Sequence, residues 1–191
     1  MDQPPPDSKD WTWVLHQPCP ECGYDSASVD PGDVAALMRA NAAAFRSALK
    51  RGDIVGQRPP VAPGAPPKWS ALEYGAHVRD VYKLAAERIT RMIKRKGPTF
   101  TDWDQDEAAV KGDYSSADAD RVAYDLATNA GKAADLLEKV RGDDWQRTGM
   151  RSDGAGFTIA TFGVYILHDV THHLWDVEQG YEAIKEAKKA G

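Results

Sequence analysis

The sequence has few cysteines and no long apolar run, and both shortages narrow the class of protein. Only two cysteines occur among its 191 residues. They lie close together, at Cys19 and Cys22, so disulfides cannot brace a domain of this size. No segment approaches the run of about 18 apolar residues that suggests a membrane helix, and residues 1–10 lack the apolar core of a signal peptide. We therefore expect a cytoplasmic protein with no membrane contact.

The chain also lacks a concentrated basic surface. Its 24 lysines and arginines are scattered among 29 aspartates and glutamates, and its net charge is −5. Proteins that bind nucleic acid instead gather basic residues along one face or one helix. Nucleic acid is therefore not the expected partner. We expect a small-molecule substrate and a protein that is a monomer or a homodimer.

Alternating strand patterns are absent as well, and apolar residues recur at helical spacing. This periodicity predicts four helices of roughly 20 residues each, and the charged tail at 181–191 is suited to a short fifth helix. The four expected ranges are 31–51, 70–96, 117–141 and 158–179. We therefore predict an all-α fold, in which an irregular N-terminal arm at 1–30 precedes a four-helix bundle at 31–191.

Local signals mark the start of a helix and the loops. Ser70 and Glu73 have the spacing of a capping box, and Trp69 is placed to pack onto the first turn of the same helix. Residues 55–68 contain five prolines and two glycines, which is typical of a stiff loop. Further loops are expected at 98–115 and 143–156.

The two cysteines form the motif Cys19-Pro-Glu-Cys22, with His16 three positions before it. A zinc knuckle or a redox pair is one interpretation, and a tight turn that carries buried thiols is the other. Tetrahedral zinc needs four ligands, and the sequence contains no second CxxC motif. We therefore favour the tight turn and expect that replacing both cysteines by serine leaves the metal content unchanged.

The segment 157–180 contains three of the five histidines and two aspartates within a mostly apolar helix. Spacing alone favours His168 and His172 as a metal-binding i,i+4 pair. At about 100° per residue, however, these two lie roughly 160° from the apolar stripe around Val170. Asp169 and His173, also spaced i,i+4, lie on the flank of that stripe. We therefore predict Asp169 and His173 as the inward pair, with His168 and His172 as the alternative pair, facing solvent or another part of the chain.

His77, in the second expected helix, is the best candidate for a third ligand. Together with Asp169 and His173 it would provide two imidazoles and a carboxylate, which leave coordination positions open for water or substrate. Asp176 is placed to accept the other ring N–H of a ligating histidine and fix its tautomer. A lone histidine on the flank of an apolar stripe is, however, more often a satisfied core residue.

Two motifs resemble those of the DinB-like superfamily. In Trp69-Ser-Ala-Leu-Glu-Tyr-Gly-Ala-His77 a tryptophan precedes the histidine by eight residues, and Asp169-Val-Thr-His-His173-Leu-Trp-Asp176-Val177 fits the second motif of the family. The resemblance covers about residues 33–180. The family includes YfiT-type proteins and mycothiol-dependent maleylpyruvate isomerases. The resemblance implies an antiparallel four-helix bundle with a long crossover and a metal held by His77, Asp169 and His173.

Three functions follow as hypotheses. The resemblance to the isomerase-like branch, whose middle ligand is acidic, implies a thiol S-transferase or isomerase. Zn²⁺, or alternatively Ni²⁺, Mn²⁺ or Fe²⁺, would activate a low-molecular-weight thiol such as mycothiol. In this hypothesis Arg79, Arg151 or Arg147 would bind a carboxylate of the thiol or substrate.

The second hypothesis is a hydrolase that uses a metal-activated water, with Asp104 or Asp80 as the general base. Asp104 belongs to a loop in which aromatic residues alternate with carboxylates, so it is also a candidate for the pocket mouth. The third hypothesis is a non-catalytic ligand-binding or stress-response bundle. Metal content and thiol dependence of turnover distinguish the three.

Overall fold

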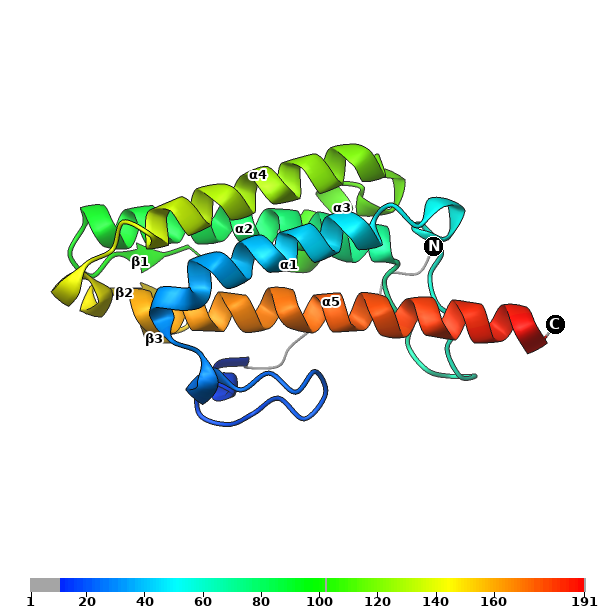
Figure 1. The fold of residues 1–191 in the computed structure, drawn as a ribbon, viewed down its shortest axis with the longest axis horizontal. Helices are drawn as coiled ribbons and strands as arrows, with labels where there is room; N and C mark the ends of the chain where they lie inside the picture. The colour runs from blue at the N-terminus through cyan, green and yellow to red at the C-terminus, as the bar shows by residue number, and fades with distance from the viewer. Residues whose placement is uncertain (1–10, 102, 191) are drawn as a thin grey trace.

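Four long helices lie side by side in the computed structural model, which describes residues 11–101 and 103–190 (Figure 1). Helices α1 (Val34–Ala48) and α5 (Ile159–Ala190) run in one direction, and α2 (Ala71–Lys94) and α4 (Ala119–Leu137) run in the other. The chain between α2 and α4 therefore crosses back along the bundle. The predicted all-α four-helix bundle is confirmed.

The bundle axis is filled by large apolar side chains from all four helices. They include Met38, Phe45, Tyr82, Ile89, Leu126 and Phe162, all fully buried. None of the described helices combines the length and the apolar character needed to cross a bilayer.

Two segments that were expected to be loops contain regular structure. A short helix, α3 (Gln105–Lys111), interrupts the first of them. Three short strands form a sheet in which β1 (Thr99–Phe100) pairs parallel with β2 (Thr148–Arg151), and β2 pairs antiparallel with β3 (Gly156–Thr158). Strands of two to four residues are too short to display an alternating pattern, so their absence from the prediction has a simple cause.

Helix α5 is longer than predicted. We expected it to stop near Gly180, with any further helix separate, but it continues without a break to Ala190. Tyr181 explains the continuation because its hydroxyl donates to the Ala48 carbonyl at 2.8 Å, and Arg51 covers its ring at 4.5 Å. These tertiary contacts offset the low helix propensity of Gly180.

The start of α2 has the structure that its sequence predicts. Ser70 and Glu73 form the reciprocal hydrogen bonds of a capping box, and the ring of Trp69 packs 5.5 Å from that of Tyr74, one turn into the helix. Arg58 donates to the Glu73 carboxylate at 3.0 Å. This ion pair joins the Pro-rich loop to the first turn of α2.

The N-terminal arm, residues 11–29, lies along the outer side of α5 (Figure 1). Tyr24 fixes it there by donating its hydroxyl hydrogen to the Val164 carbonyl at 2.9 Å. Residues 1–10 of the predicted arm and Asp102 of the predicted loop lie outside the described residues.

Candidate metal centre

His77 on α2 faces Asp169 and His173 on α5. One ligand atom from each of the three side chains lies within 4.8 Å of the other two. The Nε2 atoms of both histidines are 3.8 Å from Oδ1 of Asp169, and the two imidazole rings are 4.7 Å apart. The structure thus brings together the three residues that helical phase and the resemblance singled out.

Three donor atoms of this cluster, on His77 and Asp169, are buried without a hydrogen-bond partner among the described residues. His77 is 0% exposed, and within residues 11–101 and 103–190 neither of its ring nitrogens, nor Oδ1 of Asp169, has a partner. Each such atom costs about 1–3 kcal/mol when left unpaired. The 3.8 Å separations are too long for hydrogen bonds. They do fit two ligands of one ion, since donors about 2.1 Å from a common ion lie at most about 4.2 Å apart. The residues present therefore fit a divalent cation.

Electrostatics place these groups in the protonation states that a cation requires. Burial lowers the pKa of His77, so its imidazole is neutral at physiological pH. Burial opposes ionisation of Asp169, but its interactions with His77 and His173 hold its pKa below the ordinary value. A carboxylate and a neutral imidazole then offer lone pairs to the same point.

Aromatic rings and a carboxylate orient the two imidazoles. The ring of His77 lies 5.5 Å from that of Trp69 and 5.6 Å from that of Trp103. Asp176 Oδ2 lies 3.1 Å from Nδ1 of His173, the contact expected of a carboxylate that fixes the tautomer of a ligand. This contact leaves Nε2 of His173 directed at Asp169.

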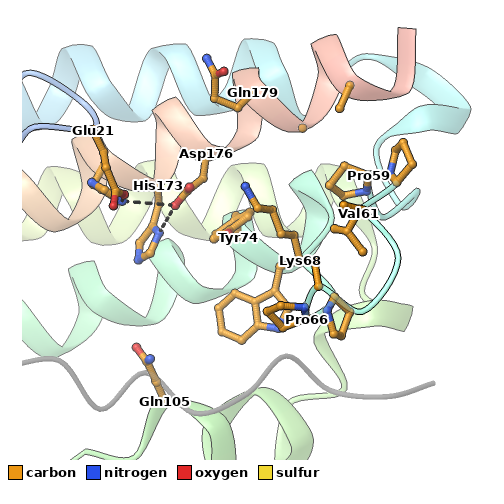
Figure 2. Close-up of a pocket in the computed structure, with 18 of the residues that line it drawn as sticks. Glu21, Pro59, Val61, Pro66, Lys68, Tyr74, Gln105, His173, Asp176 and Gln179 are labelled. Carbon is orange, nitrogen blue, oxygen red and sulfur yellow. Dashed lines mark hydrogen bonds and ion pairs between the residues drawn. The ribbon is translucent and has the colours of Figure 1, made fainter. Parts of the chain in front are cut away.

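A pocket of about 520 Å³ lies beside His173 (Figure 2). His173 and Asp176 form one side of it, and the Pro-rich loop, including Pro59, Val61 and Pro66, faces them. Its volume lies within the range of small-molecule sites. The composition of the loop had indicated a stiff connection, but only the structure shows that it forms a pocket wall. Gln105 and Asp106, which also line the pocket, belong to the loop that the sequence made a candidate for the pocket mouth. No sequence signal selected the polar lining residues Glu21, Lys68, Tyr74 and Gln179.

Asp104 and Asp80, the two candidates for the general base, each accept hydrogen bonds away from the pocket. Asp104 is the N-cap of α3, where its side chain accepts hydrogen bonds from the backbone N–H groups of Asp106 and Glu107 at 2.9 and 2.8 Å. Asp80 accepts from Arg79 at 2.8 Å and from the Tyr114 hydroxyl at 2.6 Å. Neither carboxylate lines the described pocket.

The predicted basic residues also lie outside the described pocket lining. Arg79 pairs with its neighbour Asp80, and Arg151 pairs with Asp153 beside the small sheet. Arg147 donates to the Met92 carbonyl at 2.8 Å. Lys68 is the basic side chain that the described lining does contain.

His168 and His172 lie on the side of α5 away from His77, where the N-terminal arm covers them. Only 2% of His168 and 6% of His172 is exposed. Of the two environments expected for this pair, solvent or another part of the chain, the structure shows the second. Their rings pack 5.6 and 5.2 Å from that of Trp11.

The fold and the clustered donors define a helical-bundle protein with a candidate metal centre between two helices. The family model of the DinB superfamily matches residues 55–177, and the chain belongs to this superfamily. The solved structure of YfiT from Bacillus subtilis is similar, with a TM-score of 0.67 at 16% sequence identity, covering 84% of this chain and 91% of that one. YfiT is described as a probable metal-dependent hydrolase with an unusual four-helix bundle topology. Comparison with curated protein sequences gives no significant match.

Proposed function

We propose that the protein is a divalent-metal-dependent hydrolase of a small molecule. The observation that carries the proposal is the convergence of His77, Asp169 and His173, in which both ring nitrogens of His77 and Oδ1 of Asp169 are buried without a hydrogen-bond partner among the described residues. This donor set adjoins a pocket of about 520 Å³ at His173. The description of YfiT, which shares the fold, supports the same reaction class. Zn²⁺ suits two imidazoles and a carboxylate, and Ni²⁺, Mn²⁺ and Fe²⁺ are the alternatives.

In this proposal all three side chains coordinate the ion, through different atoms. His77 and His173 would hold the ion through nitrogen, and Asp169 would hold it through oxygen. When bound, the ion would act as a Lewis acid and lower the pKa of a coordinated water. Asp176 keeps a proton on Nδ1 of His173, so that Nε2 carries its lone pair toward the centre.

A carboxylate in the pocket is suited to accept a proton from the attacking water. We assign this role to Asp106, because it lines the pocket whereas the sequence candidate Asp104 does not. The apolar Pro-rich wall opposite would hold the organic part of the substrate and displace water from it.

The test combines metal content with turnover. We expect the full chain, stripped by a chelator, to regain hydrolysis of a panel of esters and amides when Zn²⁺, Ni²⁺ or Mn²⁺ is added. His173→Ala should lose both the turnover and the bound ion. The matched control is His16→Ala, which changes an exposed histidine. Hydrolysis that survives both chelation and His173→Ala would exclude the proposal.

Thiol activation at the same centre is the second candidate function. Its support is the acidic ligand Asp169, which stands between the two histidines at 3.8 Å from each, a donor set that resembles the isomerase-like branch. A low-molecular-weight thiol such as mycothiol would then occupy the pocket, with Lys68 available to bind a carboxylate. Turnover of electrophilic substrates that depends on added thiol would favour this candidate over hydrolysis. A metal-binding protein with neither activity would instead be a ligand-binding bundle.

A further inference from the structure

A second cluster of metal-ligating side chains lies on the opposite flank of α5. Cys19 and Cys22 come from the arm, and His168 and His172 come from α5. One ligand atom from each of the four lies within 4.8 Å of the other three. The cysteines and histidines are about 150 positions apart in sequence, so only the docking of the arm onto α5 brings them together.

The spacing of the cluster suits a tetrahedral ion. Sγ of Cys19 lies 3.6 Å from Nδ1 of His172. Ligands at about 2.3 Å for sulfur and about 2.0 Å for nitrogen stand about 3.5 Å apart around a tetrahedral zinc. The Cys19-Pro-Glu-Cys22 segment forms a tight turn in which the Gly23 amide donates to the Cys19 carbonyl at 2.9 Å. Gly23 has a φ of 74°, which glycine adopts without strain, and the turn directs both thiols to the same side.

The burial of the cysteine and histidine side chains in this cluster indicates that they bind a further group, such as a metal ion. Cys19 and His168 are each 2% exposed, and Nε2 of His168 has no hydrogen-bond partner among the described residues. A buried imidazole nitrogen without a protein partner can instead donate its lone pair to a metal ion.

The surroundings of His172 match those of a ligating histidine. Its Nδ1 faces Cys19, while its Nε2 lies 3.3 Å from the Glu21 carboxylate and 3.8 Å from that of Asp176. A carboxylate on the second nitrogen holds the proton there and leaves the first nitrogen free to coordinate. Glu21 lies within the CPEC motif, so the turn supplies both thiols and this orienting carboxylate.

We propose that Cys19, Cys22, His168 and His172 bind one Zn²⁺ in a closed structural site that fastens the N-terminal arm to α5. Two sulfur and two nitrogen ligands complete a tetrahedron and leave no position for substrate, which separates this site from the open three-ligand centre on the other flank. Binding deprotonates the two thiols and releases two protons. The two ligands that the CxxC motif lacks in sequence are supplied by α5.

The site would also shape the pocket of the first centre. Glu21 and Trp11, both in the arm, line that pocket together with His172. Oδ2 of Asp176 lies 3.8 Å from Nε2 of His172 and 3.1 Å from Nδ1 of His173. Figure 2 shows the contact of Asp176 with His173. A zinc ion in the arm would therefore hold one wall of the pocket in place. The inference stands on its own donor set and does not depend on the proposed hydrolysis.

Metal counting and cobalt spectroscopy on the full chain test the inference. Cys19→Ser with Cys22→Ser should contain one equivalent of zinc fewer than the wild type, which reverses the expectation from the sequence. Substitution of zinc by Co²⁺ should give a thiolate-to-cobalt charge-transfer absorption in the wild type and in His173→Ala. The same absorption should be absent from the double cysteine variant and weakened or shifted in His172→Ala. His16→Ala, an exposed histidine next to the motif, should behave as the wild type.

The outcomes are decisive in both directions. Unchanged zinc content in the double cysteine variant, or no charge-transfer absorption in reduced wild-type protein, would overturn the inference. A Cys19–Cys22 disulfide that forms in air, in protein that binds no zinc when reduced, would assign the pair to redox chemistry instead. Should the arm fail to dock in the double variant, thiol labelling of the wild type still decides: both thiols should resist labelling until a chelator is added. Failure of the first centre would leave these cysteine results intact.

Discussion

His77 places an ionisable ring in a fully buried position where neither nitrogen has a hydrogen-bond partner among the described residues. Structures avoid such groups unless a ligand satisfies them, because desolvation of each unpaired polar atom is costly. A core histidine that served packing alone would find a carbonyl or hydroxyl partner. In the proposed metal centre, the ion would supply the partner that this ring lacks.

Because of this cost, we predict that His77→Leu raises the stability of the metal-free protein and weakens its binding of the metal. Without metal, the variant should be more stable than the wild type by about 1–3 kcal/mol, because an unpaired polar ring is replaced by an apolar side chain. Urea unfolding of both proteins in the presence of a chelator measures this difference. Added Zn²⁺ should raise the melting temperature of the wild type more than that of the variant. A large loss of stability in the chelated variant would instead mark His77 as a packing residue.

At the scale of elements, the start of α2 fixes both His77 and the Pro-rich wall of the pocket. Glu73 completes the capping box and binds Arg58, so one carboxylate joins the helix to the loop. Burial would raise the pKa of Glu73, but hydrogen bonds from Arg58 and Ser70 outweigh it and hold the pKa below the ordinary 4.5. The ionised form is therefore favoured by folding.

Glu73→Gln should lower the free energy of unfolding by about 3 kcal/mol at pH 7, since it removes one member of a buried ion pair. A carboxylate with a depressed folded-state pKa stabilises the protein above its unfolded pKa and ceases to do so as pH falls through the folded value. The difference between wild type and variant should therefore be constant from pH 7 to about pH 5 and shrink below about pH 4. Urea unfolding across this range measures it, with Glu182→Gln as the exposed control. A difference that does not depend on pH would rule out this role for the carboxylate.

At the scale of the whole molecule, α5 carries ligand candidates on both flanks. Asp169 and His173 face α2, and His168 and His172 face the arm. Two adjacent histidines can serve different centres because successive helix positions point about 100° apart. Helix α5 thus contributes to the candidate centre beside the pocket and to the proposed site beneath the arm.

Removal of zinc should release the arm while the bundle stays folded, because the bundle has a continuous apolar core of its own. Hydrogen exchange with and without a chelator should show faster exchange in residues 11–29, whereas α1 and α4, which carry no proposed ligand, should be unchanged. The cysteine double variant should exchange rapidly in the arm even without a chelator. Equal protection of the arm in all three samples would show that Tyr24 and the packing of Trp11 hold it without an ion.

Local patterns predicted the long helices well because periodicity and capping act over a few residues. The capping box at Ser70 and the four long helices follow from such signals. Helix α3 and the three strands were missed, and the tail beyond Gly180 was expected as a separate short helix although it continues α5 without a break. Those elements depend on contacts with distant segments, such as that of Tyr181 with Ala48, which no local pattern records.

The helical bundle, the family motifs and the helical phase of α5 can all be recognised in the sequence alone. Phase follows from the geometry of a single helix, so it separates Asp169 and His173 from His168 and His172 without knowledge of the rest of the chain. What each flank of α5 meets is visible in the folded protein: His77 on one side, and Cys19 and Cys22 on the other. The reason is physical. Ligands on separate segments converge only when the core packs and the arm docks onto α5. The number of residues between two ligands in the sequence does not indicate the distance between them in the folded protein.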